Sequence, residues 1–417
     1  MSSRGRTIRL GTRGSDLALR QAATVAERLE GRRFEVELVT VETTGDRITD
    51  ELIHRLGKTG AFVRDLDEEV LSGDLDAAVH SMKDMPTEMP DDLVVAGVPE
   101  RGPPGDLLCT PDGASLSALP EGAVVGTSSL RRGAQLLATR EDLDVQPLRG
   151  NVDTRVEKLL APTIQREYQR RLDAESEETD FAEYNEVDDG DDGHDETDSD
   201  DTGAGGGDTE TEDDEDGEES EFDRTLEEWF DGLAEIERRA SEREIDTEYD
   251  AIVLAEAGLE RIGLPHHVPH ERLPPTEFVP APGQGALAVT AASGDLAEDI
   301  RSVLDHPHSR VESTVERTVL ETLGGGCIAP VGIHAVLQGP VVRTTVRVLD
   351  RGGEEEVRAS RELPVERHAA AAHAFATDLA ERGAADLIER ARRDDGVDRG
   401  SDDGDAPVEP DREDEQS

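Results

Sequence analysis

Two patterns of apolar residues alternate along the first 160 residues. Short apolar runs predict strands, and stretches in which apolar residues recur every three or four positions predict helices. The predicted strands are Thr7–Leu10, Glu35–Glu42, Ala77–His80 and Ala123–Gly126, and the predicted helices are Leu17–Leu29, Phe62–Leu71 and a Ser-capped helix within residues 127–140. This alternation predicts an open α/β sheet, in which ligands bind at the carboxyl ends of the strands.

The pattern breaks at residues 161–246. Residues 173–223 are rich in Gly, Asp, Glu and Thr and nearly lack apolar residues, so we predict that they are disordered. Helices are predicted on either side, over Thr163–Leu172 and Arg224–Arg243. The second has an apolar stripe that we expect to dock on its own chain, formed by Leu226, Trp229, Phe230, Leu233 and Ile236. Because a strand and a short helix resume at Tyr249–Leu264, residues 161–246 are interpreted as an insertion.

The C-terminal part groups its strands and helices instead of alternating them. After a strand at Ala286–Val289, the predicted helices are Val311–Leu323 and Arg367–Arg392, and the predicted strands are Val331–Leu337, Val341–Leu349 and Glu354–Leu363. This grouping predicts a small α+β domain. The tail from about Asp394 is acidic, and we predict that it is disordered.

The charge of the chain indicates the kind of environment to which the protein is suited. The formal net charge is -54, and 27 acidic residues with no Lys or Arg lie in residues 173–223. Only three of the 44 basic residues are lysines. An acid-coated, lysine-poor surface predicts adaptation to high salt, where screening reduces self-repulsion; an ordinary acidic cytosolic protein is the alternative. Because no basic stripe is available to meet phosphates, we expect no nucleic-acid partner.

The sequence shows no signal peptide and no apolar run long enough for a membrane helix, so we expect a cytoplasmic protein without a membrane partner. Cys109 and Cys327 are interpreted as free thiols in a reducing compartment. Two cysteines without a histidine at ligand spacing do not form a zinc site, and no metal is expected.

Four segments place polar or charged groups where a predicted strand gives way to a turn. They are GTRGS with Arg13 and Ser15, HSMKDMP with Lys83 and Asp84, GTSSLRR with Thr127, Ser128, Ser129, Arg131 and Arg132, and LRGNVDTR with Arg149, Asn151 and Arg155. A helix start with free N–H groups and hydroxyls binds anions, and arginine binds a carboxylate with two hydrogen bonds. Together the groups favour a ligand with several carboxylates or phosphates.

Each group alone also has an ordinary structural explanation. An Arg-Arg pair at a helix start is usually solvated, and a Lys83–Asp84 surface pair would contribute under ~1 kcal/mol. Ser128 and Ser129 could serve only as a helix cap, worth about 1 kcal/mol. A thiol behind three glycines, as in LGGGCIAPVG, could be an inert buried cysteine. Only the combination is specific.

That combination, in this order, resembles the porphobilinogen deaminase family, whose members are also called hydroxymethylbilane synthases. The matching stretches are TIRLGTRGSDLAL, VHSMKDMP, VVGTSSLRR, LRGNVDTR, YDAIVLAEAGLERIGL, APGQGA and GGGCIAPVG. They cover nearly all of the chain except the insertion and the tail. The resemblance implies a transferase of tetrapyrrole synthesis that joins four porphobilinogen molecules head to tail into hydroxymethylbilane, with release of ammonia.

The resemblance also implies roles for individual residues. Cys327 would carry a dipyrromethane cofactor through a thioether bond, and its glycines would let the loop reach the site. Asp84 would be the catalytic carboxylate, which stabilises the cationic azafulvene left by loss of ammonia and holds the pyrrole N–H. The expected cofactor-binding residues are Lys83, Asp84, Thr127, Ser128, Ser129, Arg131 and Arg132, and the expected substrate-binding residues are Arg13, Ser15, Arg149, Arg155 and Arg261.

The domain organisation that the resemblance implies has two α/β lobes, similar to those of periplasmic binding proteins, and a small C-terminal α+β domain. Two chain crossings near Glu100–Pro104 and Pro280–Gln284 would link the lobes. The expected boundaries are residues 1–102 and 283–304 for the first lobe, 103–160 and 247–282 for the second, 161–246 for the insertion, 305–393 for the C-terminal domain and 394–417 for the tail. Family analogy favours a monomer.

Some features depart from the family pattern. Members usually have a Gly-Lys-Gly lid before a Phe-Val stretch, whereas LGKTGAFV displaces Lys58 by one residue, so we assign Lys58 no role. The acidic insertion is not a family element, and Cys109 matches no family motif.

Two rival hypotheses remain open. A non-catalytic anion-binding protein with two lobes would explain the arginines but not Asp84 or the glycine-flanked Cys327. An inactive relative retained as a scaffold would explain the insertion. Intact mass separates the first rival from an enzyme with a bound cofactor, and turnover of porphobilinogen separates the second.

Overall fold

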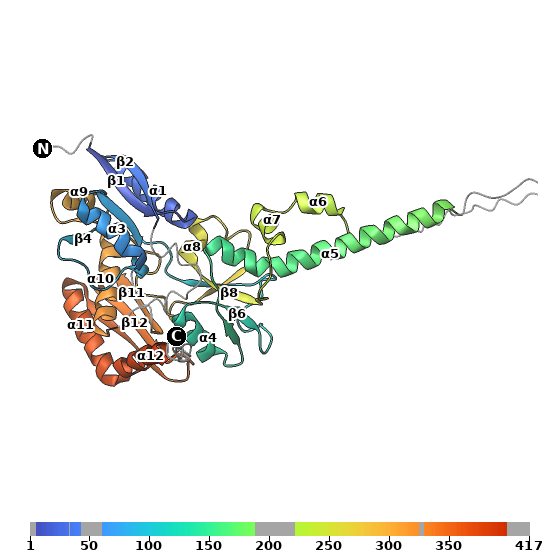
Figure 1. Ribbon diagram of the computed structural model, residues 1–417. Helices are drawn as coiled ribbons and strands as arrows, with labels where there is room; N and C mark the ends of the chain where they lie inside the picture. The colour runs from blue at the N-terminus through green and yellow to red at the C-terminus, as the bar shows by residue number, and fades with distance from the viewer. Residues whose placement is uncertain (1–5, 33, 43–60, 188–221, 325–328, 398–417) are drawn as a thin grey trace, which may run out of the picture. The chain divides into compact units, whose positions relative to one another are not determined.

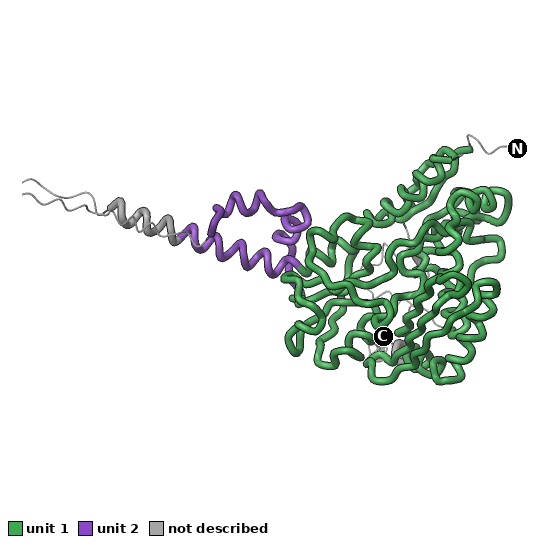
Figure 2. The backbone as a smooth tube through the Cα atoms, turned by 180° about the vertical axis from the view of Figure 1, so that it is seen from behind, with its two compact units in different colours: residues 1–159, 247–417 green, residues 160–246 purple. Residues whose placement is uncertain are grey.

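The computed structural model describes residues 6–32, 34–42, 61–187, 222–324 and 329–397, with the side chains of residues 61–62, 177–187 and 394–397 left aside. The chain forms two compact units, Met1–Leu159 with Thr247–Ser417 and Leu160–Asp246 (Figure 2). The larger unit contains three sheets and is a mixed α/β fold (Figure 1).

The first sheet has the strand order β2-β1-β3-β10-β4. Its strands are β1 (Arg6–Arg13), β2 (Phe34–Val41), β3 (Ala77–Ser81), β4 (Leu93–Gly97) and β10 (Leu287–Ala292). The strands β2, β1 and β3 are parallel, and β10 runs antiparallel to both of its neighbours. Buried residues of α1 (Asp16–Glu30) and α9 (Asp295–Leu304) pack in one cluster with β1 and β10, whereas α3 (Ala61–Ser72) contributes to a separate cluster with β3.

The second sheet repeats this arrangement, with the order β7-β6-β8-β5-β9. Its strands are β5 (Asp106–Cys109), β6 (Val124–Gly126), β7 (Asp144–Gln146), β8 (Ala251–Ala255) and β9 (His270–Leu273). The strands β7, β6 and β8 are parallel, and β5 runs antiparallel to both neighbours. Helices α4 (Leu130–Thr139), α5 (Val152–Val187) and α8 (Glu256–Arg261) follow β6, β7 and β8.

The chain crosses twice between these sheets, and the two crossings are in direct contact. The Gly102 N–H donates to the Gly285 carbonyl at 3.1 Å, and Gln284 Nε2 donates to the Pro104 and Gly105 carbonyls at 2.7 and 3.0 Å. Gly285 has a φ of +84°, and a Cβ there would lie 2.5 Å from the Gly102 oxygen. Only glycine allows this approach.

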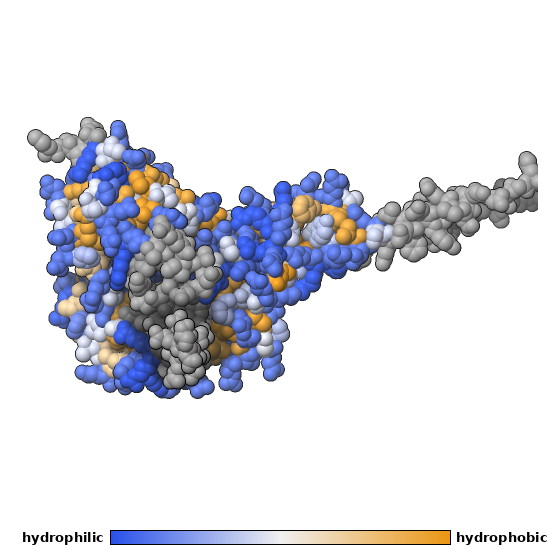
Figure 3. Space-filling view, in the orientation of Figure 1, coloured by the Kyte–Doolittle hydropathy of each residue, from blue (hydrophilic) through white to orange (hydrophobic). Residues whose placement is uncertain are grey.

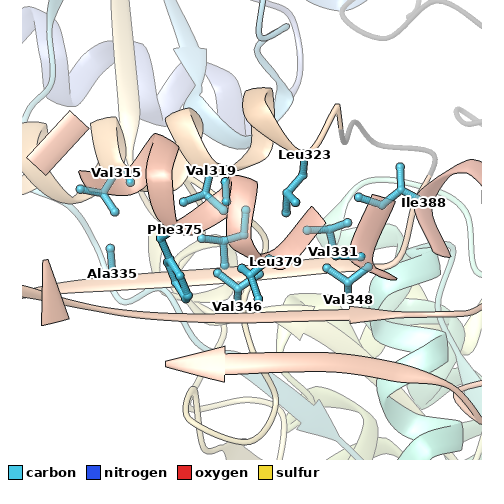
Figure 4. Close-up of a cluster of buried hydrophobic side chains, with 14 of the residues drawn as sticks. Val315, Val319, Leu323, Val331, Ala335, Val346, Val348, Phe375, Leu379 and Ile388 are labelled. Carbon is cyan, nitrogen blue, oxygen red and sulfur yellow. The ribbon is translucent and has the colours of Figure 1, made fainter. Parts of the chain in front are cut away.

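The C-terminal region is an antiparallel sheet, β11 (Val331–Gln338), β12 (Val341–Leu349) and β13 (Glu356–Pro364), with helices α10 (Pro307–Thr322), α11 (His368–Leu379) and α12 (Ala385–Val397). Its core joins Val319 of α10, Phe375 of α11 and Val346 of β12, all fully buried (Figure 4). The helix predicted over Arg367–Arg392 is therefore two helices, because Gly383 takes a φ of +103° between them.

Helix α5 differs from two of our predictions. We predicted a helix start at Thr163 and disorder from Asp173, but α5 begins at Val152 and continues through Pro162 to Val187. A proline inside a helix removes one hydrogen bond, which burial of neighbouring residues such as Leu159 offsets. Residues 188–221 lie outside the described part.

The predicted helix Arg224–Arg243 is divided into α6 (Leu226–Asp231) and α7 (Glu235–Ser241). The Trp229 and Phe230 rings lie 6.5 and 6.3 Å from the Tyr168 ring of α5, so the apolar stripe docks on its own chain, as predicted.

Replacing Gly285 with Ala should destabilise the protein much more than replacing Gly122. Both glycines have positive φ, +84° and +76°, but a Cβ at position 122 meets nothing within 4 Å. Gly122→Ala should cost about 1 kcal/mol of unfolding free energy from backbone strain. Gly285→Ala should cost at least ~2 kcal/mol more, since the backbone must move apart. Urea denaturation of both variants measures the difference, and equal midpoints would refute the close approach of the crossings.

Candidate active site

The first sheet brings together the predicted residues near Arg13 and Asp84. Strands β1 and β3 are parallel neighbours, with Leu10 opposite Ala77 in the register, so their carboxyl ends lie at one edge. β1 ends at Arg13, and Ser15 then caps α1 by accepting from the Ala18 N–H at 3.3 Å. β3 leads directly into a short 3-10 turn, Met82–Asp84. This edge therefore has the cations and the carboxylate that the sequence predicted.

The second sheet places the hydroxyl segment at the corresponding edge. After β6, the Ser129 side chain accepts from the Arg132 N–H at 3.5 Å and caps α4. Ser128 Oγ donates to the Leu148 carbonyl at 2.7 Å, and Thr127 Oγ1 accepts from the Ser129 N–H at 3.2 Å. These bonds fix the segment between the ends of β6 and β7.

Arg131 and Arg132 are buried and share one carboxylate, that of Asp106. Arg131 Nη2 and Arg132 Nη2 each lie 2.8 Å from an Asp106 oxygen. Burial alone would raise the pKa of Asp106, but the two guanidinium groups outweigh it and hold that pKa below its usual value. The pair of arginines thus retains a net positive charge after Asp106 is counted.

Sequence reasoning did not identify Asp106. It lies at the first position of β5, directly after the first crossing, and its partners are 25 or more residues away. The one local signal is a charged residue opening the apolar run DLLC, where a buried strand would not otherwise need one.

Charged groups from the two sheets interact with one another at Lys83, which follows β3, and at Arg155, which lies in α5 after β7. The pKa of Lys83 is lowered by burial and then by Arg132 and Arg155, against the opposing effects of Asp84 and Asp106. Burial, with a smaller effect from Arg132, lowers the pKa of Arg155 to about 10. The Asp84 carboxylate is exposed beside these groups. Cations from both sheets therefore repel one another, which favours binding of an anion.

Three further predicted residues lie at the ends of elements of the two sheets. Arg149 and Arg13 are half-buried at the ends of β7 and β1. Arg261, in the last turn of α8, donates from Nη2 to the Gly285 carbonyl at 2.6 Å, and burial lowers its pKa. Arg261 thus contacts the second crossing between the sheets.

Cys327 and Lys58 lie outside the described residues. The described residues on either side of Cys327 are attached to the rest of the fold: α10 ends at Thr322, and the Ile333 N–H of β11 donates to the Pro280 carbonyl at 2.9 Å. A Cβ on Gly332 would lie 2.5 Å from the Val279 oxygen, so β11 packs directly on the second crossing. Cys109 is fully buried in β5, and burial raises the pKa of its thiol to about 12.

No helix among the described residues is both long and apolar enough to cross a membrane.

Comparisons with known proteins match nearly the whole chain to one family. Residues 8–169 and 234–299 match a family model described as "Porphobilinogen deaminase, dipyromethane cofactor binding domain", and residues 311–381 match its "C-terminal domain". A probable porphobilinogen deaminase of Halobacterium salinarum is 56% identical over 388 residues, which is 92% of this chain and 98% of the relative.

Two relatives of lower identity also match nearly the whole chain. A probable porphobilinogen deaminase of Methanococcoides burtonii is 34% identical over 384 residues, 92% of this chain and 96% of its own. The porphobilinogen deaminase of Rubrobacter xylanophilus is 37% identical over 392 residues, 92% of this chain and 97% of its own. With its two mixed sheets, its C-terminal α+β region and these matches, the chain belongs to the porphobilinogen deaminase family.

Proposed function

We propose that this protein is a hydroxymethylbilane synthase, a transferase that condenses four porphobilinogen molecules head to tail and releases one ammonia for each. The observation that carries the proposal is the cluster of Lys83, Arg132 and Arg155, whose cations come from both sheets beside the exposed Asp84 carboxylate. Each pyrrole of the substrate has an acetate and a propionate. A site with excess buried positive charge stabilises such a ligand.

The residues of the site fit a dipyrromethane cofactor. Arg131 Nε is buried and, within the described residues, has no acceptor. Arg131 and Arg132 share a single carboxylate, so further carboxylates would complete their neutralisation. We assign the cofactor carboxylates to Lys83, Arg131, Arg132 and the hydroxyls of Thr127, Ser128 and Ser129, and the covalent attachment of the cofactor to Cys327. Ser128 would exchange its bond to the Leu148 carbonyl for one to the cofactor. When bound, the cofactor supplies the pyrrole chain that is extended.

Asp84 is the proposed catalytic residue. Asp84 is exposed, whereas Lys83 next to it is half-buried, so the acid is accessible to an incoming ligand. There it would accept a pyrrole N–H and stabilise the positive charge that develops as ammonia leaves. Holding the charge acceptor in a preformed turn avoids reorganisation during the reaction.

The remaining cations are assigned to the incoming and growing chain. Arg13 and Ser15 lie at the end of β1, Arg149 and Arg155 follow β7, and Arg261 lies in the last turn of α8. The lowered pKa of Arg155 and Arg261 reflects burial that a bound carboxylate would offset. The overall charge of -54 repels an acidic substrate, but a local arginine cluster outweighs distant, screened charges.

We further propose that the two five-stranded sheets form two lobes joined by the crossings, with the domain boundaries expected from the sequence. The enzyme is proposed to be monomeric, cytoplasmic and adapted to high salt. On the face shown in Figure 3, hydrophilic residues predominate and apolar residues form small patches, which supports a surface suited to salt.

Intact mass under denaturing conditions tests the covalent attachment. The wild-type protein should be heavier than its sequence by two pyrrole units, because a thioether survives denaturation. Cys327→Ser should have the bare mass and essentially no turnover. Cys109→Ala is the matched control and should keep the added mass, since Cys109 is fully buried in β5. Added mass that persists in Cys327→Ser would refute the assignment.

Asp84→Asn should retain the added mass but lose turnover of porphobilinogen by about 100-fold or more, the usual loss for a positioned acid–base group. The amide has the same shape without the charge. Asp91→Asn, at another exposed position, should leave turnover unchanged. Equal activity of the two variants would show that Asp84 has no catalytic role.

Replacing residues 188–221 with a short Gly/Ser linker should leave turnover at high salt within about twofold, because the site residues lie outside this segment. The change removes 19 of the 98 acidic residues and no Lys or Arg. Reduced self-repulsion should lower the salt concentration needed for full thermal stability. An inactive but folded protein would contradict the expected passive role.

A further inference from the structure

A cavity of about 240 Å³ lies between α10 and the segment from Met82 to Val98, and Lys83 and Asp84 are not among its lining residues. Its apolar wall includes Met82, Val95 and Val98. Its polar wall comes from one face of α10 and includes Ser313, Arg317 and Thr318. None of the polar wall residues has a role in the proposed reaction.

Arg317 brings an unneutralised charge to this cavity. Its guanidinium donates to the Met85 and Pro86 carbonyls at 3.4 and 2.6 Å, which are neutral acceptors. Burial lowers the pKa of Arg317, and the exposed Glu321 opposes that shift without forming an ion pair among the described residues. A guanidinium has five N–H donors, so further donors remain for a ligand.

Ser313 adds an independent observation. Its side chain is 2% exposed and lines the cavity, and its Oγ has no hydrogen-bond partner within the described residues. Buried hydroxyls are normally hydrogen-bonded, so an unpaired one facing a cavity indicates a missing acceptor. The other arginine of the cavity, Arg310, is already paired with Asp305 and the Val95 carbonyl.

We propose that this cavity is a second ligand site, which binds a small organic carboxylate with an apolar body. The carboxylate would accept from Arg317 and Ser313, and the apolar body would contact Met82, Val95 and Val98. A charge-assisted bond to a recessed guanidinium is among the stronger polar contacts. An inorganic anion would meet the cations but leave the apolar wall uncovered.

Benzoate is a suitable probe, measured by calorimetry on the full-length protein at constant ionic strength. Benzamide has the same body without the charge, and inorganic phosphate has the charge without the body. Benzoate should bind at least about tenfold more tightly than either. Similar affinities for all three would overturn the proposal.

Variants separate this cavity from the arginines of the proposed active site. Arg317→Gln should weaken benzoate by about tenfold or more, and Ser313→Ala by about three- to tenfold, while thermal stability of Ser313→Ala is retained because an unpaired hydroxyl is removed. Arg343→Gln, at an exposed position of β12, is the matched control and should bind normally. Arg149→Gln should also bind normally. Unchanged binding in Ser313→Ala and Arg317→Gln, or loss only in Arg149→Gln, would refute the second site.

Discussion

The rest of the site depends on the ion pairs that the buried Asp106 carboxylate forms with Arg131 and Arg132. This carboxylate neutralises part of the charge of Arg131 and Arg132 on α4, and Oδ1 also accepts from Gln284 Nε2 at 3.0 Å. One group therefore connects the start of the second sheet, the helix with the paired arginines and the second crossing. Removing one partner from such a network leaves buried charge uncompensated, which typically costs about 3–5 kcal/mol.

Two chain crossings connect the two sheets, and each crossing leads into a strand of the other sheet. In each five-stranded sheet the fourth strand in the strand order runs antiparallel to both neighbours, and a crossing delivers it: β5 enters the second sheet, and β10 returns to the first. Glu316 of α10 ties the C-terminal region to both crossings, because it pairs with Arg101 at 2.9 Å and accepts from the Gly283 N–H at 2.6 Å. The same carboxylate accepts from the Ala335 N–H of β11 at 2.8 Å. The C-terminal region is thus positioned by the segment that joins the sheets.

Sequence reasoning placed many of the proposed site residues at the ends of strands because the signals for those ends are local. The strand that ends at Arg13, the turn with Asp84 and the cap at Ser129 follow from patterns a few residues long. The structure places all three near strand ends, as the α/β pattern predicts. The position of Cys327 relative to Asp84 stays a prediction, because residues 325–328 lie outside the described part.

What sequence reasoning missed depends on long-range contacts or weak local signals. The partners of Asp106 and Glu316 are far away in the chain, so neither residue stands out in a short window. Strands β5, β6, β7 and β9 have only three or four residues, too short for a clear alternation; of these, only β6 was predicted. The start of α5 was misplaced because local propensity weighs Pro162 heavily, whereas burial in the folded chain outweighs it.

The burial of Cys109 has a chemical consequence for a protein with two cysteines. A nucleophilic thiol reacts as the thiolate, and a side chain with no exposed surface and a pKa of about 12 supplies almost none near neutral pH. Electrophiles that enter the folded protein therefore do not react readily at Cys109. Desolvation within β5 is therefore enough to keep this sulfur unreactive in the folded protein, with no need for a separate device that shields it.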